Sequence, residues 1–162
     1  ADCQSIPFKN NYFDTIVANH MLFYLKDLKQ GLTEITRVLK NNGTFYCTTY
    51  SKYHMQEISE LAQNFDSRIS LSDDPLPERF GLENGKDILK SYFNYVELKK
   101  YEDYLLITEA QPLIDYILSC HGNQNEHLGN RLKEFKIYIE DLIKESQGIK
   151  ITKDSGLFIC TK

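Results

Sequence analysis

Two polar residues, Asn19 and His20, directly follow the apolar run Phe13–Ala18. A short apolar run of this kind is typical of a buried parallel strand, so the pair is expected at its carboxyl end. Open α/β sheets bind their ligands at such strand ends, and a histidine there is able to act as a general base near neutral pH. We therefore predict that Asn19 contacts a ligand and that His20 is the catalytic residue. The alternative is that both residues only cap the strand.

A second group of residues has the chemistry of a small-molecule pocket. Tyr24, Tyr50, Tyr53 and His54 offer aromatic walls with polar tips, which is the usual lining of such sites. We predict that Tyr24, Tyr50 and His54 bind the substrate. With 11 tyrosines in the chain, ordinary partly buried tyrosines are the alternative.

Metal binding is not expected. Cys120, His121 and His127 are the only grouping worth considering, and they lack a fourth ligand at suitable spacing. The four cysteines are widely separated and include no C-x-x-C pair. We interpret them as reduced thiols in a cytoplasmic protein.

The elements that must position Asn19 and His20 are read from periodicity. Apolar residues at three- and four-residue intervals predict a helix from about Asp27 to Lys40, ended by a left-handed Asn42-Gly43 stop. Thr44–Tyr50 is rich in β-branched and aromatic residues and predicts the next strand. Strand, helix and strand with tight connections predict a parallel βαβ unit.

The rest of the chain predicts a mixed α/β fold. The expected helices are Met55–Phe65, Leu82–Phe93, Glu109–Cys120 and Glu126–Ser146; the expected strands are Tyr95–Tyr101 and a last one within Ile151–Thr161, preceded by a Lys153–Gly156 turn. No linker divides the chain. We expect a single α/β lobe over residues 1–162, with a helical insertion or lid at about 109–147.

Bulk composition excludes some partners. The 41% hydrophobic fraction is enough for a core, and the net charge of −4 without a basic run argues against a duplex nucleic-acid binder. No apolar run approaches the ~18 residues that span a bilayer, so no membrane partner is expected.

Four segments, in order and at a characteristic spacing, carry a resemblance to a known family: ADCQSIPF (Ala1–Phe8), FDTIVANHMLFYLKD (Phe13–Asp27), LTEITRVLKNNG (Leu32–Gly43) and FYCTTYSKYHM (Phe45–Met55). Together they resemble the class I S-adenosylmethionine-dependent methyltransferases of type 11. The resemblance implies a Rossmann-like fold, here partial, with the later strands of a mostly parallel sheet, an antiparallel last strand and flanking helices.

The same resemblance implies roles for individual residues. The Asp2 carboxylate would accept a hydrogen bond from the adenine amino group of S-adenosylmethionine, and the Cys3 backbone N–H would face the ring. Asn19 would lie near the methionine portion of the cofactor. The family's glycine-rich turn and ribose-binding acidic residue have no counterpart in this chain, whose eight glycines never form G-x-G.

These absences lead us to expect the carboxy-terminal part of a methyltransferase domain that lacks the amino-terminal cofactor-binding half. One edge of the Phe13–Ala18 strand would then be unpaired, and exposed edges recruit other strands. We expect a homodimer, a strand swap or an excerpt of a longer protein.

A nicotinamide or flavin enzyme of related doubly wound topology ranks last, because it requires a G-x-G-x-x-G that this chain lacks. Two other functions stay open at this point. The first is methyl transfer from S-adenosylmethionine to a small-molecule acceptor, with the activity of this chain alone undecided. The second is a non-catalytic, truncated methyltransferase-like interaction module. Methyl transfer needs positioning and at most one base, so the lack of a nucleophile motif does not separate them.

Overall fold

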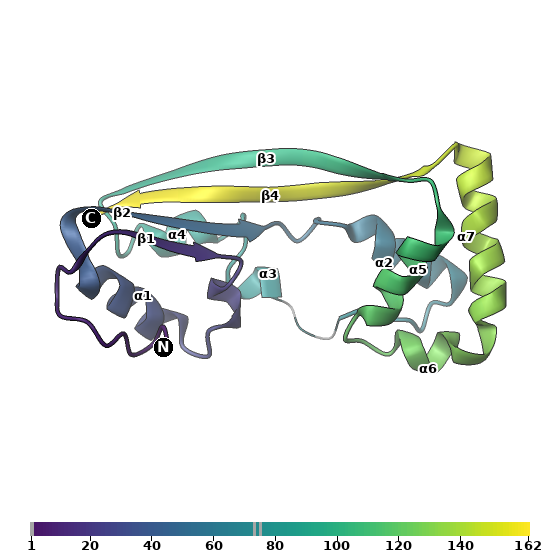
Figure 1. The fold of residues 1–162 in the computed structure, drawn as a ribbon, viewed down its shortest axis with the longest axis horizontal. Coiled ribbons are helices and arrows are strands. Elements are labelled where there is room, and N and C mark those ends of the chain that lie inside the picture. Colours follow the sequence, from purple (N-terminus) through teal and green to yellow (C-terminus); the bar gives the residue numbers. More distant parts are fainter. Residues whose placement is uncertain (1, 73, 75) are drawn as a thin grey trace. The chain divides into compact units, whose positions relative to one another are not determined.

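The structure is a computed structural model that describes residues 2–72, 74 and 76–162. The first residue of the ADCQSIPF segment, Ala1, lies outside the described residues. The strands are β1 (Phe13–Asn19), β2 (Leu39–Tyr50), β3 (Tyr95–Ile107) and β4 (Ile149–Thr161). The helices are α1 (Leu28–Val38), α2 (Gln56–Phe65), α3 (Leu76–Arg79), α4 (Gly85–Leu89), α5 (Ala110–Ser119), α6 (Gln124–Leu128) and α7 (Leu132–Ser146), with short 3₁₀ turns at Leu22–Tyr24 and Gly129–Arg131 (Figure 1).

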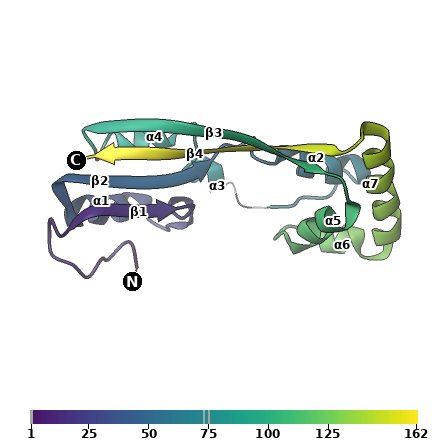
Figure 2. The same cartoon turned by 45° about the horizontal axis from the view of Figure 1, so that its top comes forward.

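The strands form one sheet in the order β1-β2-β4-β3, which can be followed in Figure 2. β1 and β2 are parallel, with Asn19 opposite Thr48. β2 and β4 are antiparallel, with Thr48 opposite Leu157, and Figure 1 shows β3 and β4 running in opposite directions. The predicted α/β class, the parallel β1-α1-β2 unit and the antiparallel last strand are confirmed.

Helix α1 connects the two parallel strands. It begins after Asp27, whose Oδ1 accepts a hydrogen bond from Gln30 N at 2.9 Å, a normal N-cap. Its inner residues Leu32, Ile35 and Val38 are almost fully buried. The helix ends at Val38, because Leu39 already has an extended backbone.

The predicted left-handed stop at Asn42-Gly43 is therefore wrong, since both residues lie within β2. Gly43 serves a different purpose from the one we predicted. A Cβ at this position would lie 3.0 Å from the Asp14 carbonyl oxygen and 2.8 Å from the Leu39 side chain. The glycine thus permits close approach between β1 and β2.

Several other boundaries differ from the prediction. The helix expected over Leu82–Phe93 is limited to Gly85–Leu89. The expected turn at Lys153–Gly156 is part of the continuous strand β4. Gly156 is needed there because a Cβ would lie 2.9 Å from Leu82 Cδ2 and 3.0 Å from Leu98 Cδ1. The single helix expected over Glu126–Ser146 is divided at Gly129–Arg131. Strand β3 continues to Ile107, six residues beyond the predicted end at Tyr101.

Two compact units divide the chain, each with its own apolar core. Unit 1 contains Ala1–Lys52, Leu76–Tyr101 and Asp154–Lys162, and unit 2 contains Tyr53–Pro75 and Glu102–Lys153. The core of unit 1 includes Phe23, Phe45, Phe80, Phe93 and Phe158. The core of unit 2 includes Ile58, Leu113, Ile114, Ile117, Phe135 and Ile139. The single lobe and the insertion at about 109–147 stay a prediction.

The part of the sheet in unit 1 has two different faces. Phe45, Cys47 and Phe158 are fully buried on the face that packs against α1 and α4. Because side chains alternate along a strand, Thr48 of β2 and Leu157 of β4 lie on the opposite, open face. Within the described ranges, no helix is both long and apolar enough to cross a membrane.

Strand β1 lies at one end of the sheet. Among the described residues no strand pairs with its outer edge, and Val17 there is 59% exposed. Pairing of this edge with another strand, in a homodimer or a strand swap, stays a prediction.

Candidate functional site

His20 is held at the carboxyl end of β1 by the neighbouring strand. Its backbone N–H donates to both the carbonyl oxygen and Oγ1 of Thr48, each at 3.1 Å. Thr48 Oγ1 also lies 3.4 Å from Asn19 Oδ1 and donates to it. His20 has a φ of 46°, an uncommon conformation for a residue with a side chain. Backbone strain of this kind often accompanies functional sites.

A hollow of about 350 Å³ opens beside His20 in unit 1. We call it the His20 hollow. It is lined by residues from, or directly following, the four strands: His20, Thr48, Lys99, Lys100, Tyr101, Ser155, Gly156 and Leu157. Thus the structure places His20 where we expected a ligand, although its catalytic role stays a prediction.

An aromatic row continues from His20 toward Tyr24. The His20 and Tyr50 rings are stacked, with centroids 6.0 Å apart. Tyr50 then meets Phe23 edge-on at 5.1 Å, and Phe23 meets Tyr24 at 4.7 Å. Phe23 is buried, whereas Tyr24 is 65% exposed. The structure therefore links two of the predicted substrate residues to His20, through a core phenylalanine that the sequence did not single out.

Asp2 and Cys3 lie in a turn on the amino-terminal side of α1. Asp2 Oδ1 accepts from Gln4 N at 2.9 Å, and the Asp2 carbonyl accepts from Ser5 N at 3.0 Å. Cys3 is half-buried against the core of unit 1. Burial, together with the charges of Asp2 and Glu34, raises the pKa of the Cys3 thiol. The thiol is consequently a neutral packing group rather than a nucleophile.

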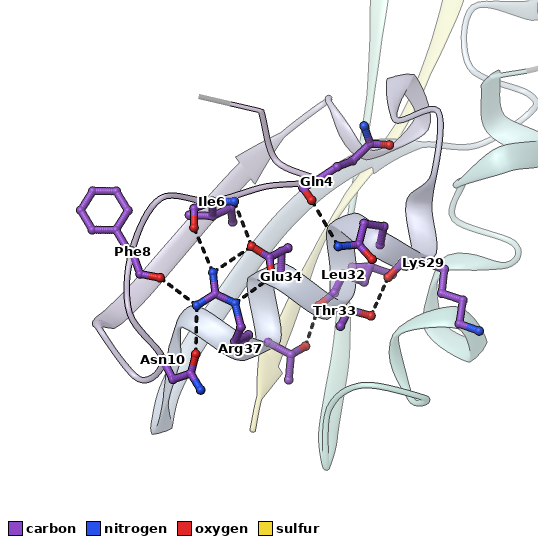
Figure 3. A network of polar contacts seen from close by, with 11 residues as sticks. Gln4, Ile6, Phe8, Asn10, Lys29, Leu32, Thr33, Glu34 and Arg37 are labelled. Atoms are coloured by element: carbon purple, nitrogen blue, oxygen red, sulfur yellow. Dashed lines mark hydrogen bonds and ion pairs between the residues drawn. The ribbon is translucent and has the colours of Figure 1, made fainter.

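The segment that carries Asp2 and Cys3 is fixed to α1 by Arg37 and Glu34 (Figure 3). Arg37 forms two hydrogen bonds with Glu34, at 2.7 and 2.8 Å. Its remaining N–H groups donate to the Ile6 carbonyl at 2.9 Å and the Phe8 carbonyl at 2.7 Å. Glu34 Oε2 accepts in turn from Ile6 N at 2.9 Å. These bonds hold the amino-terminal segment against α1.

The Arg37 side chain stabilises the charged form of Glu34. The hydrogen bonds from Arg37 and from the Ile6 backbone lower the pKa of Glu34 to about 2. The E-x-x-R spacing on one helical face was the available signal for the pair.

Part of the chain is similar to known methyltransferases. Residues 1–47 match the family described as "Methyltransferase domain". The malonyl-[acyl-carrier protein] O-methyltransferase of Chlorobium luteolum is 25% identical over 154 residues, which cover 93% of this chain and 54% of that protein. A candidate type II methyltransferase from Anaeromyxobacter dehalogenans has a similar structure, with a TM-score of 0.62, 16% identity and coverage of 99% and 69% of the two chains. Residues 1–47 are thus similar to a methyltransferase domain, and the fold is similar to that of a methyltransferase.

A second relative matches less of this methyltransferase-like chain. The ubiquinone/menaquinone biosynthesis C-methyltransferase UbiE of Vibrio cholerae is 30% identical over 69 residues, covering 43% of this chain and 26% of that protein. The matched part of the chain therefore spans about half the length of the first relative and about a quarter of the second.

His54 is the one predicted site residue that belongs to unit 2. It is half-buried in the turn that precedes α2. Unit 2 has a hollow of its own, of about 410 Å³, lined by residues that include Glu109, Lys136 and Lys144. None of the predicted site residues lines this second hollow. Within the described ranges, no three His, Cys, Asp or Glu side chains are grouped as a metal site requires.

The sequence analysis missed several residues of the His20 hollow. Thr48, Lys99, Tyr101 and Ser155 were assigned only to strands or a turn. Periodicity was the signal available for two of them: Lys99 and Tyr101 alternate with Val96 and Leu98, which pack on the core. Periodicity does not predict that β3 and β4 are neighbours in the sheet.

Proposed function

We propose that this chain takes part in methyl transfer from S-adenosylmethionine to a small-molecule acceptor. One observation carries the proposal: the segment that matches the methyltransferase domain ends at residue 47 and includes the strand end that presents Asn19 and His20. Ligands of open α/β sheets bind at this kind of edge.

The residues on this side of the sheet suit the cofactor. Asp2 is exposed, and its Oδ2 accepts a long hydrogen bond of 3.4 Å from Gln4 Nε2, so the carboxylate is accessible to an adenine amino group. Asn19 is exposed at the strand end and would contact the methionine portion. The sulfonium of S-adenosylmethionine supplies an already activated methyl group.

The chain's own residues would orient the acceptor and, where needed, accept its proton. His20 is the candidate base, because its ring lies at the strand end and lines the hollow. Tyr50 and Tyr24 would form the aromatic side of the acceptor site. The relatives differ in their acceptors, since one is named an O-methyltransferase and another a C-methyltransferase. The names of these relatives therefore do not identify the acceptor of this chain.

Calorimetric titration with S-adenosylhomocysteine tests this function. The protein at its natural length should bind this product, and Asp2→Asn should weaken the binding. Asp141→Asn is the matched control, since Asp141 is an exposed carboxylate on α7, 3.5 Å from Lys144 Nζ. If neither S-adenosylhomocysteine nor S-adenosylmethionine gives heat or a thermal shift, the proposal is wrong.

A further inference from the structure

The wall of the His20 hollow differs in charge from the protein as a whole. The chain has a net charge of −4, yet among the residues that the structure describes no carboxylate lines this hollow. Its wall contains an imidazole, the cation of Lys99 and the hydroxyls of Thr48, Tyr101 and Ser155. We propose that the hollow binds an anionic group, a carboxylate or a phosphate, of the methyl acceptor. The assignment to an acceptor rests on the proposed function.

Lys99 is the cation that faces the hollow. Leu98 packs against the core of unit 1, and neighbouring residues of a strand point to opposite faces. Lys99 and Tyr101 therefore lie on the open face of the sheet, where Thr48 and Leu157 also lie. The same alternation directs the side chain of Lys100 to the other face.

Lys99 has spare capacity for an anion. Its Nζ is 4.0 Å from Glu97 Oε1, and the two side chains are 60% and 42% exposed. An exposed pair at this separation contributes little. A bound carboxylate or phosphate would provide shorter, charge-assisted hydrogen bonds. The hydroxyl of Ser155 is on the same face and would supply an additional donor, whereas the Thr48 hydroxyl donates to Asn19 Oδ1.

The hollow also has an apolar part. Leu157 and the ring of Tyr101 belong to its wall, and a volume of about 350 Å³ is in the lower range for small-molecule sites. A ligand that consists only of an anionic group would make no contact with this apolar part of the wall. The fitting ligand is consequently amphiphilic, with an apolar body and one anionic group.

Short-chain probes test the inference without the cofactor. Hexanoate and hexyl phosphate should each bind the protein at least about tenfold more tightly than 1-hexanol, which shares their apolar body. The tighter of the two identifies the preferred anion. Added salt should reduce the difference because it screens the charges. Equal affinity for hexanol and both anions would overturn the inference.

Variants locate the binding site. Lys99→Gln should weaken anion binding about tenfold, and Lys99→Arg should retain it. Lys90→Gln is the matched control and should change the affinity by less than about twofold, because Lys90 is an exposed lysine 3.0 Å from Asp87 Oδ1 and does not line the hollow. Unchanged binding in Lys99→Gln, with a melting temperature equal to that of the wild type, would contradict the assignment.

The two proposals fail in different ways. Binding of S-adenosylhomocysteine without anion binding would leave the methyltransferase function standing and remove the inference about the acceptor. Anion binding without any binding of the cofactor or its product would leave an anion site and remove the methyl acceptor as its ligand.

Discussion

Arg37 and Glu34, one turn apart on α1, form a two-fold hydrogen-bonded ion pair whose outer atoms also bind the backbone of the amino-terminal segment. The pair therefore does more than stabilise its helix. It positions residues 2–10, and with them Asp2 and Cys3, against α1 in unit 1.

Replacing Arg37 by lysine should release this segment. Lysine retains the charge but has no planar fork, so it cannot satisfy Glu34 and the carbonyls of Ile6 and Phe8 together. We expect faster amide hydrogen exchange at Ile6 and a lower melting temperature. Thr33→Ala is the control, because the Thr33 hydroxyl donates only to the Lys29 carbonyl of the same helix. Equal exchange at Ile6 in both variants would contradict the positioning role.

Acid should weaken the same contact. The pKa of Glu34 is lowered from 4.5 to about 2 in the folded protein, so the unfolded chain binds a proton first as the pH falls. The stabilisation by Glu34 is therefore complete above about pH 4.5 and is lost between pH 4.5 and 2. Glu34→Gln should be less stable than the wild type at neutral pH, and the difference should shrink across that window.

Chemical denaturation at several pH values measures this difference. Asp66 also contributes to the pH dependence of stability, because its hydrogen bonds with Arg68 lower its pKa. Its contribution is present in both proteins and cancels when the two stability curves are subtracted. A difference between wild type and Glu34→Gln that does not change below pH 4.5 would refute the assignment.

The predictable parts of the fold were those determined by local pattern. The spacing of Leu28, Leu32 and Ile35 indicated α1, and the apolar run before Asn19 indicated β1. Gly43 was misinterpreted because the sequence alone does not distinguish a glycine needed for close strand approach from one needed for a left-handed turn. Tertiary packing distinguishes the two, and local sequence does not contain it.

The candidate site was only half predictable for a related reason. His20 and Tyr50 end consecutive parallel strands, so a strand-end argument finds both. Lys99 and Ser155 reach the same hollow from β3 and β4, more than 40 residues from Tyr50 in sequence. Their proximity depends on the β2-β4-β3 order, which no periodicity encodes.

Two glycines of unit 2 should respond in opposite directions to alanine. A Cβ at Gly122 would overlap the Ser70 carbonyl oxygen. The Asn123 N–H of the same loop donates to that oxygen at 2.9 Å. The backbone must shift, at a cost of about 1–3 kcal/mol. A Cβ at Gly129 would meet nothing within 4 Å.

Gly129→Ala should consequently be neutral or stabilising by about 0.4–1 kcal/mol, since the backbone there is helical and alanine restricts the unfolded chain. Urea denaturation of both variants checks the pair. A destabilisation by Gly129→Ala as large as that of Gly122→Ala would mean that the clash with Ser70 does not account for the cost at Gly122.

His20→Asn separates the backbone role of His20 from the role of its ring. Asparagine tolerates the left-handed region, so the φ of 46° should be accepted without loss of stability. The imidazole is lost, so hexanoate binding in the His20 hollow should fall severalfold. Gln147→Asn is the matched control: Gln147 also has a left-handed φ, of 58°, but lies at the end of α7 and should leave hexanoate binding unchanged. If His20→Asn binds hexanoate as well as the wild type does, the ring has no part in the site and His20 serves only the turn after β1.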